Sequence, residues 1–337
     1  MNIGPRPVGD GEPTFVLAEI ASAHQGESVQ AVALAKNAQE AGADGVKFQL
    51  FRSSELVAPN DPRRSTFDQI ELAPDEWEQV LNETTALGIA ILVEVFDLTS
   101  LELAERANVA AYKVHSTDME NPEFVRAVAA TGRPVLFSTG GMGLGVVEAA
   151  ISVARTEGNQ NIMLLHGVQN FPTRVEDTHL RFIATLKHAF GLPVGFLDHV
   201  DGATAMATTL PALAVAFGAS LVEKHVTLDR GDKGFDYESA LEKKPFAQMV
   251  QLIRETEKAF GRHDLPSGES SERYRRLMRR AVLSGVSLPE GEPVQKSQLV
   301  FLRSETGLAP YEATRILGRK PRHEIPAWEP LTEDLFE

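Results

Sequence analysis

The feature that most constrains the fold is a regular alternation of short apolar segments of strand length with amphipathic segments of helix length. This alternation begins at Phe15 and is typical of βα units around a parallel sheet. The eight segments predicted as strands are Phe15–Ile20, Gly45–Phe51, Ala90–Phe96, Ala110–Ser116, Pro134–Gly140, Ile162–Val168, Val194–His199 and Leu221–Leu228.

The segments between these strands carry helical patterns, and several end at glycine, where a helix C-cap is expected. In Ser28–Gly42, for example, apolar residues recur at helical spacing. The other predicted helices are Glu76–Gly88, Leu101–Asn108, Pro122–Gly132, Val146–Gly158, Leu180–Gly191, Ala203–Gly218 and, after the last strand, Lys243–Gly261.

Two architectures can hold eight such units, an open doubly wound sheet and a closed (β/α)₈ barrel. No glycine fingerprint of the dinucleotide-binding type follows the first strand. We therefore predict a (β/α)₈ TIM barrel over residues 1–262.

The composition changes after the last helix. Residues 263–275 are predicted to be a linker, and residues 276–337 a small β-rich domain in which short strand-like runs alternate with turns. The basic run Arg273–Arg280 is interpreted as a helix start or a domain contact. A domain this small buries little area, so we expect it to pack on a barrel.

Charge and composition exclude several classes of protein. The 337 residues carry a formal net charge of -14, which argues against a nucleic-acid partner. There is no cysteine, so a metal would have to bind His, Asp, Glu or water. Neither a signal peptide nor an apolar run of spanning length is apparent, so we expect a cytoplasmic protein without a membrane partner.

In a (β/α)₈ barrel the active site lies at the carboxyl ends of the strands, and polar side chains follow nearly every predicted strand. Lys47 and Lys113 lie within apolar segments, where an unpaired ammonium is costly. The two lysines therefore predict an anion. Together with Ser116 and the turn Ser138–Gly141, they form a candidate phosphate pocket.

His199 and His225 end neighbouring strands and could meet in space. Each could instead only form a hydrogen bond within its loop. With carboxylates beside them, the two histidines suit a divalent metal of borderline hardness, such as manganese, iron or zinc, better than calcium.

At this point the sequence resembles the sialic acid synthases, which condense phosphoenolpyruvate with an N-acylated hexosamine. The resemblance covers almost the whole chain, and the tail from Arg279 resembles their antifreeze-like (SAF) domain. The matching stretches are Ala18–Ile20, His24–Gly26, Ala41–Gln49, Ala111–Ser116, Gly132–Gly140, Leu192–Gly195, Asp198–His199 and Glu223–Asp229.

This resemblance implies a metal-dependent synthase of the transferase class that makes a 3-deoxy-2-ulosonic acid and releases phosphate. The implied metal is Mn²⁺, with Mg²⁺ or Co²⁺ as alternatives, on His199 and His225. The implied partners are phosphoenolpyruvate, a sugar aldehyde and a second copy of the chain in a domain-swapped homodimer. Glu19, Lys113 and Asp118 are the implied catalytic residues. The implied substrate-binding residues are Lys47, Gln49, Ser116, Ser138, Glu94, His115, Phe171, Asp236 and, reaching the partner's site, Arg303.

Several positions depart from the family's pattern. Asp118 stands where a glutamate is usual, and His115 replaces a small residue. Glu94 replaces a threonine, Leu197 a serine and Phe171 a tyrosine. Because these changes lie around substrate contacts, we expect an acceptor other than N-acetylmannosamine, with a hydroxyl or amino group that Glu94 or His115 can contact.

Two other functions are consistent with the residues. A metal aldolase acting on pyruvate needs fewer anion contacts than two lysines and two serines provide. A non-catalytic, sugar-binding relative would explain Leu197 and Asp118.

Overall fold

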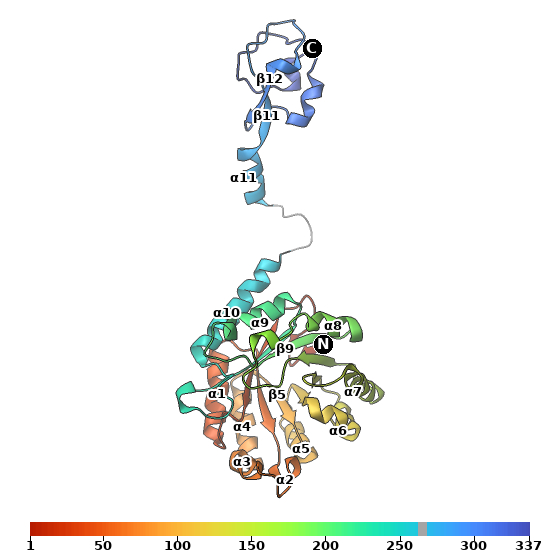
Figure 1. Ribbon diagram of the computed structural model, residues 1–337, viewed down its shortest axis with the longest axis vertical. Helices are drawn as coiled ribbons and strands as arrows, with labels where there is room; N and C mark the ends of the chain where they lie inside the picture. The colour runs from red at the N-terminus through yellow and green to blue at the C-terminus, as the bar shows by residue number, and fades with distance from the viewer. Residues whose placement is uncertain (262–267) are drawn as a thin grey trace. The chain divides into compact units, whose positions relative to one another are not determined.

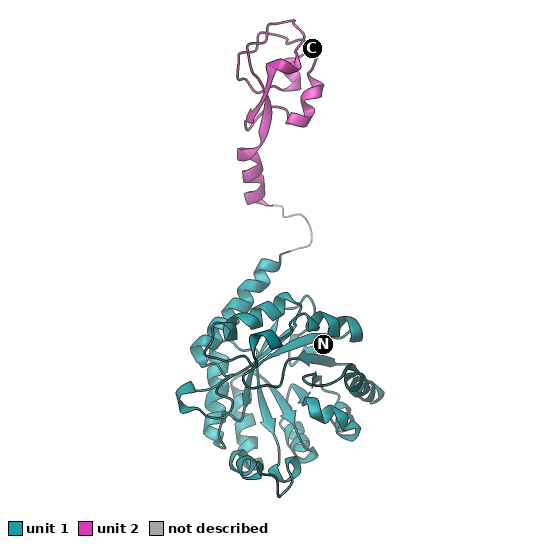
Figure 2. Ribbon diagram, in the orientation of Figure 1, with its two compact units in different colours: residues 1–261 teal, residues 262–337 magenta. Residues whose placement is uncertain are grey.

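The computed structural model describes residues 1–261 and 268–337 and divides into two compact units, Met1–Gly261 and Arg262–Glu337 (Figure 2). Each unit has its own hydrophobic core, so each is described by itself.

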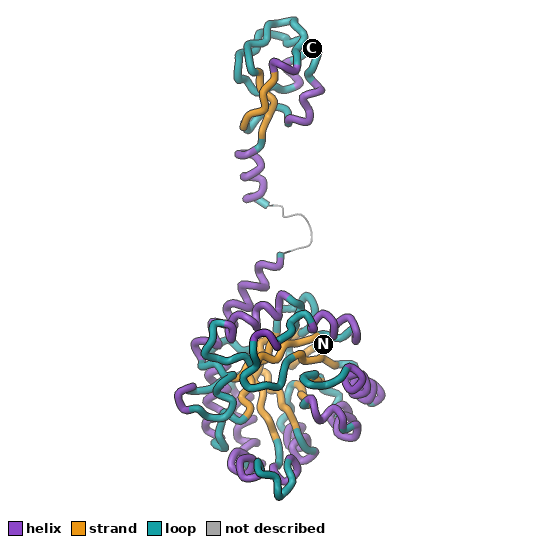
Figure 3. The backbone as a smooth tube through the Cα atoms, viewed as in Figure 1, coloured by secondary structure: helices purple, strands orange, loops and turns teal. Residues whose placement is uncertain are grey.

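The first unit is a closed barrel of eight parallel strands, as the alternating pattern predicted (Figure 1). The strands adjoin in the order β10-β3-β4-β5-β6-β7-β8-β9, and helices surround them (Figure 3). The strands are β3 (Phe15–Ala21), β4 (Gly45–Leu50), β5 (Ala90–Val95), β6 (Ala111–Val114), β7 (Val135–Ser138), β8 (Ile162–His166), β9 (Val194–Asp198) and β10 (Leu221–His225).

The register of the strands brings charged side chains to one level of the barrel. Glu19 on β3 lies opposite Lys47 on β4. Glu94 on β5 lies opposite Gln49 on one side and Lys113 on the other. Strand segments this apolar form in a parallel sheet because both of its faces are covered. The few charges they contain must therefore find partners inside the barrel.

The helices follow the predicted segments, with ends shifted by a few residues. In α1, buried alanines and a leucine recur at helical spacing, and Asn121 caps α6 by accepting a hydrogen bond from the Phe124 N–H. No helix in the described ranges is long and apolar enough to cross a membrane. The barrel's helices are α1 (Ser28–Glu40), α2 (Ser53–Leu56), α3 (Arg64–Ile70), α4 (Pro74–Ala86), α5 (Leu98–Arg106), α6 (Pro122–Ala130), α7 (Leu144–Thr156), α8 (Phe182–Phe190), α9 (Met206–Ala216) and α10 (Lys243–Phe260).

The amino-terminal end of the barrel interior is apolar. A short hairpin of β1 (Asn2–Ile3) and β2 (Arg6–Pro7) contributes Ile3, and Val8 follows it; both pack against inward side chains of the strands. Leu197 belongs to this apolar cluster, and a Cβ at Gly167 would come within 2.5 Å of the Leu197 Cβ. The lower interior of the barrel is therefore filled by apolar side chains, and the polar ends of the strands lie at the carboxyl end, where barrel sites are found.

Four of the strands and α-helices of this unit were not predicted. They are β1 and β2 of the hairpin and the short helices α2 and α3 between β4 and α4. Most predicted strands also end later than the observed ones: β10 ends at His225, not at Leu228. Beyond these ends the chain turns into the loops that carry polar residues.

The second unit is built around a small antiparallel sheet of β11 (Arg280–Ser284) and β12 (Leu299–Arg303). Its core contains Val282, Ile316 and Phe336. The predicted linker, residues 263–275, needs a correction. Its first part lies outside the described residues, but its second part belongs to helix α11 (Glu269–Met278). Glutamates in the first turn and arginines in the last suit the dipole of this helix.

Candidate active site

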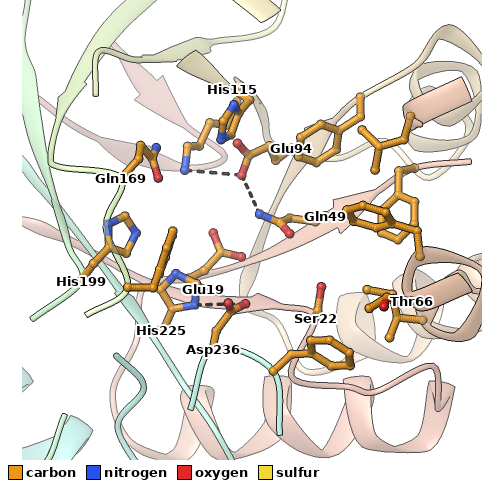
Figure 4. A pocket seen from close by; sticks show the side chains of 18 of the residues that line it. Glu19, Ser22, Gln49, Thr66, Glu94, His115, Gln169, His199, His225 and Asp236 are labelled. Atoms are coloured by element: carbon orange, nitrogen blue, oxygen red, sulfur yellow. Dashed lines mark hydrogen bonds and ion pairs between the residues drawn. The ribbon is translucent and has the colours of Figure 1, made fainter. Parts of the chain in front are cut away.

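A cavity of about 390 Å³ lies at the carboxyl end of the barrel strands (Figure 4). Its polar side is formed by strand-end residues, which include Gln49, Glu94 and His225. Its apolar side comes from the loops after β4, β5, β8 and β10, and consists of Phe51, Leu56, Phe67, Ile70, Phe96, Phe171 and Phe235. A volume of this size suits a small organic ligand.

Two lysines and three glutamates form the floor of the cavity, and we call them the ion cluster. Its members are Glu19, Lys47, Glu94, Lys113 and Glu223. The Lys47 Nζ contacts Glu19 and lies 2.7 Å from Glu94 Oε2 and 2.9 Å from Glu223 Oε1. The Lys113 Nζ lies 2.8 Å from Glu223 Oε1 and 3.4 Å from Glu94 Oε2. All five side chains are buried.

Three carboxyl groups face two ammonium groups, so one carboxyl is favoured to keep its proton. Burial raises the pKa of Glu19 to about 8, against the opposing charge of Lys47. Burial also opposes ionisation of Glu94, but Lys113 and Lys47 hold the pKa of its carboxyl below the usual range. The cluster is thus close to neutral when Glu19 is protonated.

The two histidines predicted as metal ligands lie together at the mouth of the cluster. The ring centres of His199 and His225 are 5.2 Å apart, and the Phe171 ring packs on both. Nδ1 of His199 lies 2.8 Å from the Val168 carbonyl oxygen. Since a carbonyl only accepts, this Nδ1 carries the proton and Nε2 keeps a free lone pair.

Both imidazoles are neutral at physiological pH. Burial lowers the pKa of His199 to about 4, and burial together with the charge of neighbouring groups holds that of His225 well below its ordinary value. Asp236 Oδ2 lies 4.0 Å from His225 Nδ1, and burial raises the pKa of Asp236 to about 6. Because His225 is neutral, this contact is not an ion pair.

Neutral imidazoles with free lone pairs are suitable ligands for a divalent metal. Within residues 1–261 and 268–337, no group of three or more His, Asp or Glu side chains is arranged to hold a metal ion. The protein could therefore supply His199 and His225 as two ligands, and the remaining ligands would have to come from substrate and water.

The structure brings most of the predicted site residues together, but not all of them. The cavity is lined by Glu19, Gln49, Glu94, Lys113, His115, Phe171, His199, His225 and Asp236, and Lys47 lies beneath it. Ser116, Ser138 and Asp118 do not line it, and Arg303 lies in the second unit. Ser138 Oγ accepts a hydrogen bond from the Gln169 side chain, which does line the cavity.

Asp118 lies in the 3₁₀ turn η1 (Ser116–Glu120) after β6. Burial and the negative charge of Glu94 raise the pKa of Asp118 to about 6. This carboxyl group is therefore sensitive to the charge of the cluster although it stands outside the wall of the cavity.

The sequence analysis missed the residues of the cavity wall that follow β4. Phe51, Leu56, Arg63, Thr66 and Phe67 all come from the stretch that contains α2 and α3. One signal could have identified them, because this stretch follows the carboxyl end of a barrel strand and is longer than a simple connection.

Comparison with known proteins agrees with this geometry. Residues 34–264 match the NeuB family. The uncharacterized protein MJ1065 of Methanocaldococcus jannaschii is 32% identical over 339 residues, which cover 99% of each chain. The N,N'-diacetyllegionaminic acid synthase of Legionella pneumophila is 30% identical over 335 residues, which cover 94% of this chain and 93% of that protein.

A solved structure also superposes on this chain. The N-acetylneuraminic acid synthetase of Leptospira borgpetersenii superposes with a TM-score of 0.76 at 28% identity, covering 82% of this chain and 96% of that one. With a family match over more than half of the chain and a similar barrel, this protein belongs to the NeuB family of sialic acid synthases.

Proposed function

We propose that this protein condenses phosphoenolpyruvate with an open-chain aldose to give a 3-deoxy-2-ulosonic acid and inorganic phosphate, with a divalent metal. The observation that carries the proposal is the placement of two lysines and two neutral histidines around one cavity at the barrel's active end. Membership of the NeuB family supports the same reaction class.

The proposed reaction forms one carbon–carbon bond and one carbon–oxygen bond, the latter from water, and breaks the bond between C2 and the phosphate oxygen; a proton goes to the aldehyde oxygen. C3 of phosphoenolpyruvate attacks the aldehyde carbon, water adds at C2, and the resulting adduct loses phosphate. A metal held by His199 and His225, Mn²⁺ by preference, would polarise the aldehyde carbonyl.

The chain's own residues would bind and orient the donor. Lys113 lines the cavity, where its ammonium would contact the negative charge of the donor, and the buried Lys47 contacts the same glutamates. Gln169, which lines the cavity, donates to the Ser138 hydroxyl, and Ser116 is buried at the start of η1, three residues after Lys113. Both hydroxyls are proposed to support the part of the site that binds phosphate.

The acceptor half of the cavity is proposed to differ from that of an N-acetylmannosamine enzyme. Glu94 Oε1 has no hydrogen-bond partner among the described residues, and His115 lines the same side. Together they could bind a hydroxyl or amino group of the acceptor, while Asp236 and the apolar wall contact the rest of the sugar.

The test is release of phosphate from phosphoenolpyruvate in the presence of Mn²⁺ and a panel of aldoses. We expect release with at least one aldose and none without an aldose. His225→Ala should lose both bound metal and turnover, whereas His188→Ala, an exposed histidine on α8, should keep both.

The two alternatives predict other results. Consumption of pyruvate with no phosphate release would identify a metal aldolase. Retention of bound sugar without consumption of either donor would identify a non-catalytic relative.

A further inference from the structure

Glu94 contacts both of the lysines that are proposed to bind the anionic donor. Its strand position places it directly between Gln49 on β4 and Lys113 on β6. Glu94 Oε2 accepts from the Lys47 ammonium at 2.7 Å and from the Gln49 side-chain amide at 3.2 Å, and lies 3.4 Å from the Lys113 Nζ. The Glu94 side chain is fully buried.

Three carboxyl groups surround the Lys47 ammonium. An ammonium group has three N–H donors. Lys47 donates hydrogen bonds to Glu94 and Glu223 and also contacts the carboxyl group of Glu19. A carboxylate or phosphate from solution would therefore have to share this nitrogen with the three groups or replace one of them.

The other two glutamates also contact groups besides one lysine. Glu19 Oε1 accepts from the Ala21 N–H at 2.7 Å, and Glu223 Oε1 joins both lysines at 2.9 and 2.8 Å. Each of the three glutamates has one oxygen without a hydrogen-bond partner among the described residues, but at Lys113 the contact with Glu94, 3.4 Å, is longer than the 2.8 Å contact with Glu223. Glu94 is thus the carboxylate that an anion approaching Lys113 can replace more easily.

Strand β9, which adjoins β10, carries an apolar residue beside the ion cluster. Leu197 on β9 lies opposite Glu223 and packs into the apolar lower interior of the barrel. No hydroxyl at this position can bind the charge that Glu94 excludes.

We propose that Glu94 is a specificity-determining residue that competes with the anionic group of the donor for Lys47 and Lys113. The proposal rests on the proposed use of an anionic three-carbon donor. It predicts that this protein binds such a donor more weakly than its two lysines would allow, because each binding event must displace or share a built-in carboxylate.

The experiment measures binding of phosphoenolpyruvate by titration calorimetry, at fixed pH and salt and without an acceptor. Glu94→Gln keeps the size of the side chain and removes its charge, and Glu94→Thr removes both. We expect both variants to bind phosphoenolpyruvate roughly tenfold more tightly than the wild type, or better, because one charged competitor is gone. Pyruvate, which carries only the carboxylate, should gain in the same direction.

Glu120→Gln is the matched control, because it removes an exposed charge from η1 at the same end of the barrel. It should change the affinity little, which separates local competition from a general effect of net charge. Thermal unfolding checks that each variant is folded. Because the two Glu94 variants differ in size, the test still works if one of them does not fold.

Unchanged or weaker binding by the folded Glu94 variants, including no measurable binding, would overturn the inference. An equal gain in Glu120→Gln would overturn it as well. The proposed function is judged separately. If the Glu94 variants gain affinity but no aldose yields phosphate, the proposed reaction is wrong and the competition between Glu94 and the donor stands. If phosphate is released but the affinity of the Glu94 variants does not rise, the proposed reaction stands and the competition is wrong.

Discussion

Lys47 is the residue on which the floor of the cavity depends. It is fully buried, and its ammonium is the central partner of the three glutamates. Such an ion cluster need not stabilise the fold more than apolar packing would, but removing one partner from it leaves buried charge without compensation.

Lys47→Met should therefore destabilise the protein strongly, by about 3–5 kcal/mol, because Glu19, Glu94 and Glu223 would share only Lys113. Urea unfolding measures the change. Lys243→Met, which breaks an ion pair with Glu40 on the surface, is the control and should change stability little. A loss for Lys47→Met as small as that of the control would contradict the assigned role.

Glu19 should make stability depend on pH. Its pKa rises from 4.5 to about 8 through burial, so the folded protein binds this proton more tightly than the unfolded chain. The stabilisation is complete below 4.5 and is lost as pH rises through about 8. The free energy of unfolding should fall over this window in the wild type and fall less in Glu19→Gln. Urea unfolding at several pH values tests this, and equal slopes for the two proteins would refute it.

At the scale of elements, the strands and helices of the barrel could be predicted because their periodicity is local. The segment of β3, for instance, is apolar throughout, and the spacing of buried residues in α1 is visible in the sequence. The ends of the strands could not be placed to the residue, because polar residues belong equally to a strand end and to the loop that follows it.

The site could be predicted only in part. Lys47 and Lys113 were correctly singled out as buried lysines, but we expected a bound anion to compensate their charges. The structure instead pairs them with Glu94 and Glu223. Such pairing depends on register between strands that are far apart in sequence, which no local pattern contains.

The segment that holds α2 and α3 should determine how the acceptor binds. Phe67 on α3 packs edge-on against Phe51, with ring centres 5.6 Å apart, and both line the apolar wall. Phe67→Ala should raise the KM of the acceptor by roughly tenfold and leave that of phosphoenolpyruvate unchanged, because only the apolar wall loses contact area. Steady-state kinetics with each substrate varied in turn provides the measurement.

Phe260→Ala, at the exposed end of α10, is the matched control for this prediction. An effect of Phe67→Ala on the donor alone would show that the apolar wall does not face the acceptor.

At the scale of the whole molecule, the second unit carries the one predicted site residue that the barrel lacks. Arg303 ends β12, and its side chain is exposed. The resemblance to sialic acid synthases predicts that this arginine completes the site of a second copy of the chain.

A mixture of two inactive variants tests this arrangement. Arg303→Ala keeps an intact barrel, and Lys113→Ala keeps an intact Arg303. If the sites are shared between subunits, exchange at equal amounts should restore roughly a quarter of wild-type activity, since half of the dimers would be mixed and each would contain one complete site. Activity no greater than the sum of the two separate variants would contradict shared sites.

The most direct test of the central claim is the mass of the product. The protein is incubated with Mn²⁺, phosphoenolpyruvate and each of a panel of aldoses, and the mixture is analysed by mass spectrometry. We predict that one aldose gives a new acid whose mass equals that of the aldose plus pyruvic acid, together with one equivalent of phosphate. If no aldose gives such an acid while metal is bound to His199 and His225, the account of this barrel as a phosphoenolpyruvate-condensing synthase is contradicted.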